Sequence, residues 1–323
     1  MRPFVYRRAT SLAEGAGEGV RAMGGGTDLV PLLRDGRIAP ASLVDVTRVA
    51  DADARRIDVD GDGRLRLGAL VTLADLASDA IVREGYAALA EAAASSATPQ
   101  IRNVATIAGN LCQWNRCWYF RAGVPCHLTG GDDCPAVAGD HRYHAIFGDG
   151  PCVAVHPSDP AVALLALGAS VQVEGPGGLR TMPLSEFLHA PAGSPEQASL
   201  GAGEVVSAVL VPPSGGRRSV YEKAMDRAAW AFALVSAAVV LQVRDGVVAD
   251  AAVTLGGVAG VPWQASSAEA ELRGQELTPA VVRRAAAQAT LGARPLRENA
   301  YKVDLCQGVV RSALTRLLAD GRG

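Results

Sequence analysis

The stretch AMGGGTDLV, residues 22–30, places three successive glycines between an expected strand end and an expected helix. Glycine lets the backbone approach a ligand closely and adopt positive φ, and the N–H groups of such a turn form an anion-binding nest with the following helix N-terminus. We expect Thr27 to cap that helix. A phosphate or pyrophosphate would suit the turn, although the stretch has neither the Walker pattern nor G-x-G-x-x-G. Taken alone, the stretch favours a plain glycine turn capped by Thr27.

A second turn of small residues, ATIAGN at residues 105–110, follows a predicted helical run from Thr72 to Ser96. Thr72 and Asp75 resemble the start of a capping box, and we expect the run to end at Pro99. The turn combines close backbone approach with an asparagine amide that can donate and accept a hydrogen bond. An ordinary turn entering a loop would look the same, but two such turns in one chain favour a ligand with two phosphates.

The pattern around these turns mixes short helices and strands and predicts an α+β fold in three parts, residues 1–60, 61–213 and 214–323. A predicted hairpin around a GDG turn lies at the first boundary, and the Pro/Gly/Ser-rich segment VPPSGGRRS forms the expected linker at the second. Farther along the chain, Asp159 is the predicted N-cap of an apolar helix whose first residue is Pro160.

Composition narrows the class of protein. The chain has 323 residues, of which 49% are hydrophobic and 20% charged, so it can bury a substantial core. A formal net charge of −2 provides no electrostatic footprint for nucleic acid or for an anionic membrane surface. We find neither a signal peptide nor an apolar run of membrane-spanning length, and we expect a cytoplasmic protein whose cysteines stay reduced.

Four of the six cysteines fall in one loop-like stretch. Cys117, Cys126, Cys134 and Cys152 are separated by eight, seven and seventeen residues, with several glycines between them. Thiolate ligands suit an iron–sulfur cluster or tetrahedral zinc and exclude magnesium and calcium.

Both kinds of metal centre remain open from the residues alone. No short C-x₂₋₄-C knuckle of the usual zinc type occurs among the four, which favours a cluster. Four of the five histidines lie in the same window, however, and keep a mixed Cys/His zinc site open: His127, His141, His144 and His156. Buried structural thiols and disulfides are the remaining readings.

The order of these features resembles a known family. GGGTDLVPLLR, TIAGNLCQ, CWYFR, HPSDPAVALLAL, YEKAMDRAAWAFALVSAAV and NAYKVDL are similar to segments of the FAD-binding medium subunit of molybdenum hydroxylases, the xanthine dehydrogenase family. The resemblance covers essentially the whole chain. Within the family, the four-cysteine insert most resembles the medium subunit of bacterial periplasmic aldehyde oxidase, and more distantly that of 4-hydroxybenzoyl-CoA reductase.

The resemblance implies a fold and a flavin site. The fold would be the vanillyl-alcohol oxidase (PCMH) type, with two α+β subdomains that hold FAD and a C-terminal α+β domain. The two glycine turns would bind the pyrophosphate, Asp159 the ribityl or ribose hydroxyls, and Lys223 would lie near the isoalloxazine ring, unless it is a solvated surface lysine. Trp230 is a weaker ring neighbour, or a core residue. The implied FAD contacts are Gly24, Gly25, Gly26, Thr27, Asp28, Leu29, Thr106, Ala108, Gly109, Asn110, Asp159 and Lys223.

The resemblance also implies a 4Fe-4S cluster in an insert at about residues 112–156, held by Cys117, Cys126, Cys134 and Cys152. Cys112 is left out of this ligand set, as the substitute if one of the four is wrong. The chain would carry no catalytic residue for substrate chemistry. It would be the electron-transfer subunit of a heterotrimeric aldehyde oxidase, receiving electrons from a molybdenum-cofactor subunit and a small 2Fe-2S subunit and passing them through FAD to an external acceptor.

Three alternatives stay open. A subunit related to 4-hydroxybenzoyl-CoA reductase would run electrons toward the substrate instead. A zinc-stabilised module, with or without flavin, would explain the thiols and histidines but would leave the glycine turns without a use. A free-standing flavin oxidase would need a substrate domain for which the chain is short. The resemblance also allows a periplasmic location, by co-export with a partner that carries a signal.

Overall fold

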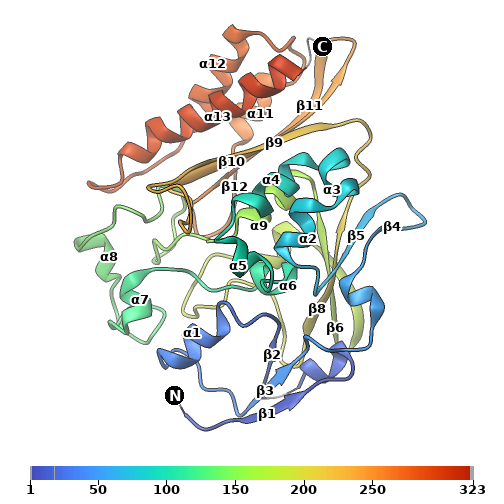
Figure 1. Cartoon of the computed structure of the whole chain (residues 1–323). Helices are drawn as coiled ribbons and strands as arrows, with labels where there is room; N and C mark the ends of the chain where they lie inside the picture. Colours follow the sequence, from blue (N-terminus) through green and yellow to red (C-terminus); the bar gives the residue numbers. More distant parts are fainter. Residues whose placement is uncertain (1, 18, 321–323) are drawn as a thin grey trace.

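The strands of the protein form three separate sheets (Figure 1). The computed structural model describes residues 2–17 and 19–320. The first sheet contains β1 (Val5–Arg8), β2 (Val20–Met23) and β3 (Ser42–Asp45); the second contains β4 (Ile57–Val59), β5 (Leu65–Gly68), β6 (Ser170–Gly175), β7 (Gly178–Pro183) and β8 (Val205–Val211); the third contains β9 (Arg218–Ala224), β10 (Val235–Arg244), β11 (Val247–Gly256) and β12 (Trp263–Gln264). Helices pack between and beside these sheets, so the predicted α+β class is confirmed.

The first sheet is parallel, in the order β1-β3-β2, and it positions the first glycine turn. Strand β2 ends at Met23, the three glycines and two further residues follow, and helix α1 (Leu29–Arg34) then begins. The predicted strand, turn and helix are therefore present. The predicted cap is wrong: the N-cap is Asp28 and not Thr27, and no side chain caps the helix, because Asp28 is bonded elsewhere.

The second sheet is antiparallel, in the order β4-β5-β8-β6-β7, and the predicted hairpin is its β4–β5 pair. Its helices are α2 (Leu73–Ser78), α3 (Ala80–Gly85), α4 (Ala87–Ser95), α5 (Pro99–Arg102), α6 (Ile107–Leu111), α9 (Asp159–Ala166) and α10 (Leu184–Phe187). The capping box of Thr72 and Asp75 is confirmed. The single run to Ser96 is wrong, because Asp79 has extended backbone, ends α2 and caps α3. Pro99 likewise begins a helix, α5, where a proline needs no N–H partner.

The third sheet is antiparallel, in the order β12-β11-β10-β9, and lies between two layers of helices (Figure 1). Helix α13 (Tyr301–Asp320) packs on β9 and β10, α11 (Ser266–Leu272) packs on β11, and α12 (Pro279–Gln288) packs on α11 and α13. Helix α4 also contacts β9 and β10, and α9 contacts β10 and β11. Strand β10 is consequently buried on both faces over its first seven residues, which explains its continuous apolar sequence.

The segment from Cys112 to His156 has little regular structure. It contains only the short helices α7 (Trp118–Ala122) and α8 (Pro135–Ala138), which lie at one side of the molecule, with α7 close to α1 (Figure 1). A small apolar cluster that includes Leu32 of α1 and Phe120 of α7 joins the two helices. None of the helices in the described part of the chain is long and apolar enough to span a membrane.

Candidate functional site

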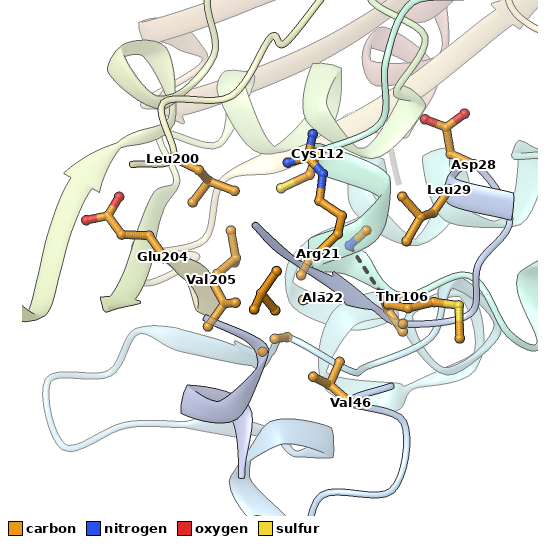
Figure 2. Close-up of a pocket in the computed structure, with 18 of the residues that line it drawn as sticks. Arg21, Ala22, Asp28, Leu29, Val46, Thr106, Cys112, Leu200, Glu204 and Val205 are labelled. Atoms are coloured by element: carbon orange, nitrogen blue, oxygen red, sulfur yellow. Dashed lines mark hydrogen bonds between the residues drawn. The ribbon is translucent and has the colours of Figure 1, made fainter. Parts of the chain in front are cut away.

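The two predicted glycine turns line one large cavity of about 440 Å³ (Figure 2). Gly24, Gly25, Gly26, Thr27, Asp28 and Leu29 border it from the first turn, and Thr106, Ala108 and Gly109 from the second. Arg21 and the segment Leu200–Val206, which no sequence signal pointed to, also line it. The structure therefore brings together two segments that lie about eighty residues apart in the sequence.

The glycines are needed because the two turns touch. A Cβ on Gly25 would lie 1.8 Å from the carbonyl oxygen of Val104, and a Cβ on Gly24 would lie 2.9 Å from Thr106 Oγ1. Gly26 has φ +70°, in the left-handed region that favours glycine. Any side chain at the first two positions would push the turns apart, so the backbone N–H groups can line the cavity only when these residues are glycine.

The second turn is held by its own cap. Thr106 Oγ1 accepts a hydrogen bond from Gly109 N at 3.2 Å, drawn as the dashed line in Figure 2, and begins helix α6. Asn110, predicted to contact the ligand at the same turn, does not line this cavity. Its Oδ1 instead accepts a hydrogen bond from Ser158 Oγ, and this contact connects the second turn to the start of α9.

Asp28 ties the glycine turn to the cysteine segment. Its carboxylate accepts hydrogen bonds from Trp114 N at 2.8 Å and Arg121 Nη2 at 2.9 Å, and also from Arg116. In Figure 2 the carboxylate is turned away from the centre of the cavity. The other atoms of Asp28 thus line the cavity, while two arginines of the insert neutralise the charge of its carboxylate.

A second cavity of about 290 Å³ lies at the start of α9, where Asp159 is one of the lining residues. Asp159 is buried and accepts hydrogen bonds from Tyr221 Oη at 2.6 Å and from Lys223 Nζ at 2.8 Å. Burial, and next the Asp159 carboxylate, raise the pKa of Tyr221 well above its ordinary value, so the phenol stays a donor. The predicted cap is again displaced by one residue: Ser158 caps α9, and Asp159 is its first residue.

Lys223 is buried, so the alternative of a solvated surface lysine is wrong. Its side chain is 2% exposed and also donates to Ser95 O at 3.1 Å. Lys223 is not among the residues that line the second cavity and stands behind Asp159, which does line it. Trp230 is 62% exposed, so its reading as a core residue is wrong as well, and the nearby Phe232 lines the cavity instead.

His156 offers a free donor to the second cavity, and sequence reasoning missed it in this role. Its Nδ1 accepts a hydrogen bond from Ser158 N, so in the neutral ring the proton is on Nε2. Nε2 is buried and has no hydrogen-bond partner among the described residues. The same holds for Ser236 Oγ beside the same cavity. Burial lowers the pKa of His156 to about 4, so the ring is neutral at pH 7. Unpaired buried polar atoms of this kind indicate a polar ligand.

The four clustered cysteines surround one small cavity of about 10 Å³, which has room for no more than about one water molecule. Cys117, Cys126, Cys134 and Cys152 all line it, and all six cysteines of the chain are free, which argues against disulfides. Cys112 lies apart from them and lines the large cavity. Burial is the main cause that raises the pKa of Cys152 to about 12 and also raises that of Cys117.

The thiols are the right donors for a soft metal centre but are not drawn tightly together. Within residues 2–17 and 19–320, no three or more His, Cys, Asp or Glu side chains are grouped so that they could hold a metal ion. His141 has both ring nitrogens bonded to backbone, to Ala136 O at 3.0 Å and Glu298 N at 2.9 Å, and is not a free ligand. The four thiols face one space, one of them in a buried residue and three in half-buried residues. As a donor set they suit a soft cationic centre, which would compensate the cost of burying thiolates.

Comparisons with known proteins agree with this geometry. A family model for the FAD binding domain in molybdopterin dehydrogenase matches residues 1–214, and one for the CO dehydrogenase flavoprotein C-terminal domain matches residues 219–317. The aldehyde oxidoreductase FAD-binding subunit PaoB of Escherichia coli (strain K12) is 39% identical, over 99% of this chain and 100% of its own length. The carbon monoxide dehydrogenase medium chain of Afipia carboxidovorans is 25% identical, over 99% of this chain and 98% of its own.

Solved structures share the fold. A chain of reconstituted CO dehydrogenase from Oligotropha carboxidovorans superposes with a TM-score of 0.75 at 23% identity, covering 98% of this chain and 97% of that one. A chain of carbon monoxide dehydrogenase from Hydrogenophaga pseudoflava gives 0.73 at 27% identity, covering 98% of both. These neighbours have the FAD-binding fold expected from the resemblance. The chain therefore belongs to the FAD-binding medium subunits of the molybdenum hydroxylases, and it is a subunit of an oxidoreductase.

Proposed function

We propose that this chain is the FAD and 4Fe-4S electron-transfer subunit of a heterotrimeric molybdenum hydroxylase that oxidises aldehydes. A large molybdenum-cofactor subunit and a small 2Fe-2S subunit would be its partners. Electrons would arrive from those subunits and leave through FAD to an external acceptor. The observation that carries the proposal is the pair of glycine turns that touch at Gly25 and Val104 and line one cavity.

The flavin would extend from the large cavity toward the second. The backbone N–H groups of residues 24–29 and of the turn at Thr106 suit the pyrophosphate, because both turns bring N–H donors to the same space. The hydrogen bond between Asn110 and Ser158 connects the second turn to α9, whose first residue lines the second cavity. The unpaired Nε2–H of His156 would then meet an acceptor on the ring.

Bound FAD would supply the redox chemistry, since it exchanges electrons singly or in pairs. The residues of the chain would position it. Asp159 offers a buried carboxylate at the edge of the second cavity, and Lys223 neutralises that carboxylate from behind. A buried pair of this kind keeps its geometry, because removing either charge would leave the other unpaired in a dry site.

The 4Fe-4S cluster is the more specific part of the proposal. It is supported by four free thiols around one cavity, by the absence of a short zinc knuckle in the sequence, and by the position of Cys112 away from the other four. A cavity of about 10 Å³ would have to widen as the cluster forms. The loops that carry the cysteines can do so, because most of the insert has no regular secondary structure.

The most direct test of this proposal is metal and flavin analysis of the protein purified with its partner subunits. Visible spectra are recorded before and after reduction with dithionite. We expect about one FAD per chain and four irons beyond those of the 2Fe-2S subunit, by the stoichiometry of a 4Fe-4S centre. Cys126→Ser and Cys134→Ser should lose those irons, whereas the matched control Cys112→Ser should keep them.

Other outcomes separate the alternatives. One zinc and no extra iron would leave a flavoprotein with a structural metal site. A protein without flavin would contradict the proposal altogether. Reduction of an aromatic CoA thioester in place of aldehyde oxidation would identify a reductase related to 4-hydroxybenzoyl-CoA reductase.

A further inference from the structure

A buried histidine touches one of the four clustered thiols. The Nε2 atom of His144 lies 3.3 Å from the Sγ of Cys117, and the His144 residue is 3% exposed. Within the described part of the chain, no other histidine of the insert forms a hydrogen bond with a cysteine sulfur; His141 is bonded to backbone on both sides. His144 therefore stands out among the histidines as a neighbour of the thiol cavity.

The ring of His144 is held in place from several directions. It packs edge-on against Trp118, with ring centroids 5.5 Å apart and an interplanar angle of 75°. Its carbonyl oxygen accepts hydrogen bonds from Lys302 Nζ at 3.0 Å and from Asn299 Nδ2 at 3.2 Å. Lys302 and Asn299 are fully buried and come from the C-terminal part of the chain. This fixed backbone leaves the ring nitrogen little freedom to move away from the sulfur.

The two ring nitrogens have different surroundings. Nδ1 is buried and has no partner among the described residues, whereas Nε2 faces the sulfur. A neutral imidazole carries one N–H, which is satisfied if it points at a thiolate and is left unpaired in a dry site if it is on Nδ1. The geometry consequently favours the tautomer with the proton on Nε2.

We propose that His144 donates an Nε2–H hydrogen bond to the sulfur of Cys117 and thereby raises the reduction potential of the cluster. The inference rests on the proposed function, because it requires that the four cysteines hold an iron–sulfur cluster. Reduction adds negative charge that spreads onto the cysteine sulfurs, and a donor to sulfur stabilises that charge. His144 acts through the ligand and is a positioning residue.

The place of the contact gives it a consequence for electron transfer. Cys117 is the only one of the four cysteines that also lines the second cavity, and His144 lines that cavity beside it. The hydrogen bond thus acts on the ligand that is nearest to the cavity assigned above to the flavin ring. A cluster held by Cys117 would lie beside the flavin ring, so a change in its reduction potential would act on electron exchange with the flavin.

The test is an EPR-monitored redox titration of the whole complex in three variants. His144→Leu removes the donor, His144→Gln keeps an N–H donor, and His141→Gln is a matched control, because His141 is equally buried in the same insert but has no contact with sulfur. We expect His144→Leu to shift the cluster to a more negative midpoint potential and to alter its EPR signal. His144→Gln should largely restore both, and His141→Gln should leave them unchanged.

Each outcome has one meaning. A fully loaded His144→Leu protein with an unchanged potential contradicts the hydrogen bond, and so does loss of the cluster from both the Leu and Gln variants while FAD is retained. A wild-type protein without the four additional irons removes the cluster from the proposed function, and this inference with it. Wild-type iron content, measured first, therefore distinguishes failure of the inference from failure of the function.

Discussion

The glycine cradle and the cysteine insert, which lie side by side, are built in opposite ways. The cradle, formed by residues 24–29 and 106–109, is made by backbone and lies between regular strands and helices. The insert, residues 112–156, has only two short helices and depends on side-chain contacts such as those of Asp28, Asn299 and Lys302. The cradle should therefore exist before its ligand binds, whereas the insert should depend on the metal centre proposed for it.

The largest effect is expected from a side chain in the cradle. Gly25→Ala would place a methyl group 1.8 Å from the Val104 carbonyl oxygen. Because that oxygen belongs to the backbone, the clash can be relieved only if the two turns move apart. We expect the variant to be purified without flavin, as measured by the visible spectrum. Gly61→Ala is the control, because a Cβ there meets nothing within 4 Å and its φ is not positive. Normal flavin content in Gly25→Ala would show that the turns need not touch.

Removal of the proposed iron should affect the insert and spare the cradle. Because the insert has little regular structure, chelation is expected to abolish amide protection between Cys117 and Cys152. Strands β2 and β8, beside the cradle, should keep theirs. Hydrogen exchange followed by mass spectrometry measures both in one experiment. Loss of protection at β2 to the same extent would mean that the two regions fold as one unit.

Asp28→Asn should weaken both regions together, because this carboxylate joins them. The substitution leaves Arg116 and Arg121 without their counter-charge in a site where their side chains are 26% and 15% exposed. We expect a loss of about 2 kcal/mol in the free energy of unfolding, and lower occupancy of both flavin and iron. Asp35→Asn, next to α1 but in an exposed ion pair with Arg34, should change neither. A defect in flavin alone would refute the coupling.

The smallest effect concerns pH. Burial lowers the pKa of His156 from 6.5 to about 4. Between these two pH values the imidazole is mostly protonated in the unfolded chain and mostly neutral in the folded chain. Stability therefore falls as pH drops from 6.5 toward 4, by about 1 kcal/mol from this group at pH 5.5. Thermal unfolding at several pH values should give a shallower slope for His156→Gln. An identical slope would show that His156 is not buried as a neutral ring.

Residues whose role is local were predictable from the sequence. The glycines of the first turn could be recognised because positive φ and close backbone approach are properties of glycine itself. The capping box of Thr72 and Asp75 and the β4–β5 hairpin are equally local and are confirmed. The clustering of four cysteines in one segment is likewise local information, and the structure places all four around one small cavity.

Predictions from the sequence were wrong where a side chain bonds to a residue far away in the chain. Asp28 replaced Thr27 at the start of α1 and directs its carboxylate to the insert, more than eighty residues away. The alternative of a solvated Lys223 was wrong for the same reason, because Lys223 pairs with Asp159 of α9. Propensity alone cannot anticipate such pairings, because their free energy comes from burial and from charge neutralisation in the folded chain.

By itself, then, the sequence determined the α+β class, the two glycine turns, the set of clustered thiols and, through their order, the family. Only the tertiary structure decided that the turns touch, that Cys112 faces the large cavity, and that His144 and His156 point toward the thiols and the second cavity. The physical reason is the sequence separation of the residues that interact. Backbone conformation is governed by neighbouring residues, whereas a histidine becomes a donor to sulfur or to a ligand only when segments far apart in sequence pack around it and exclude water.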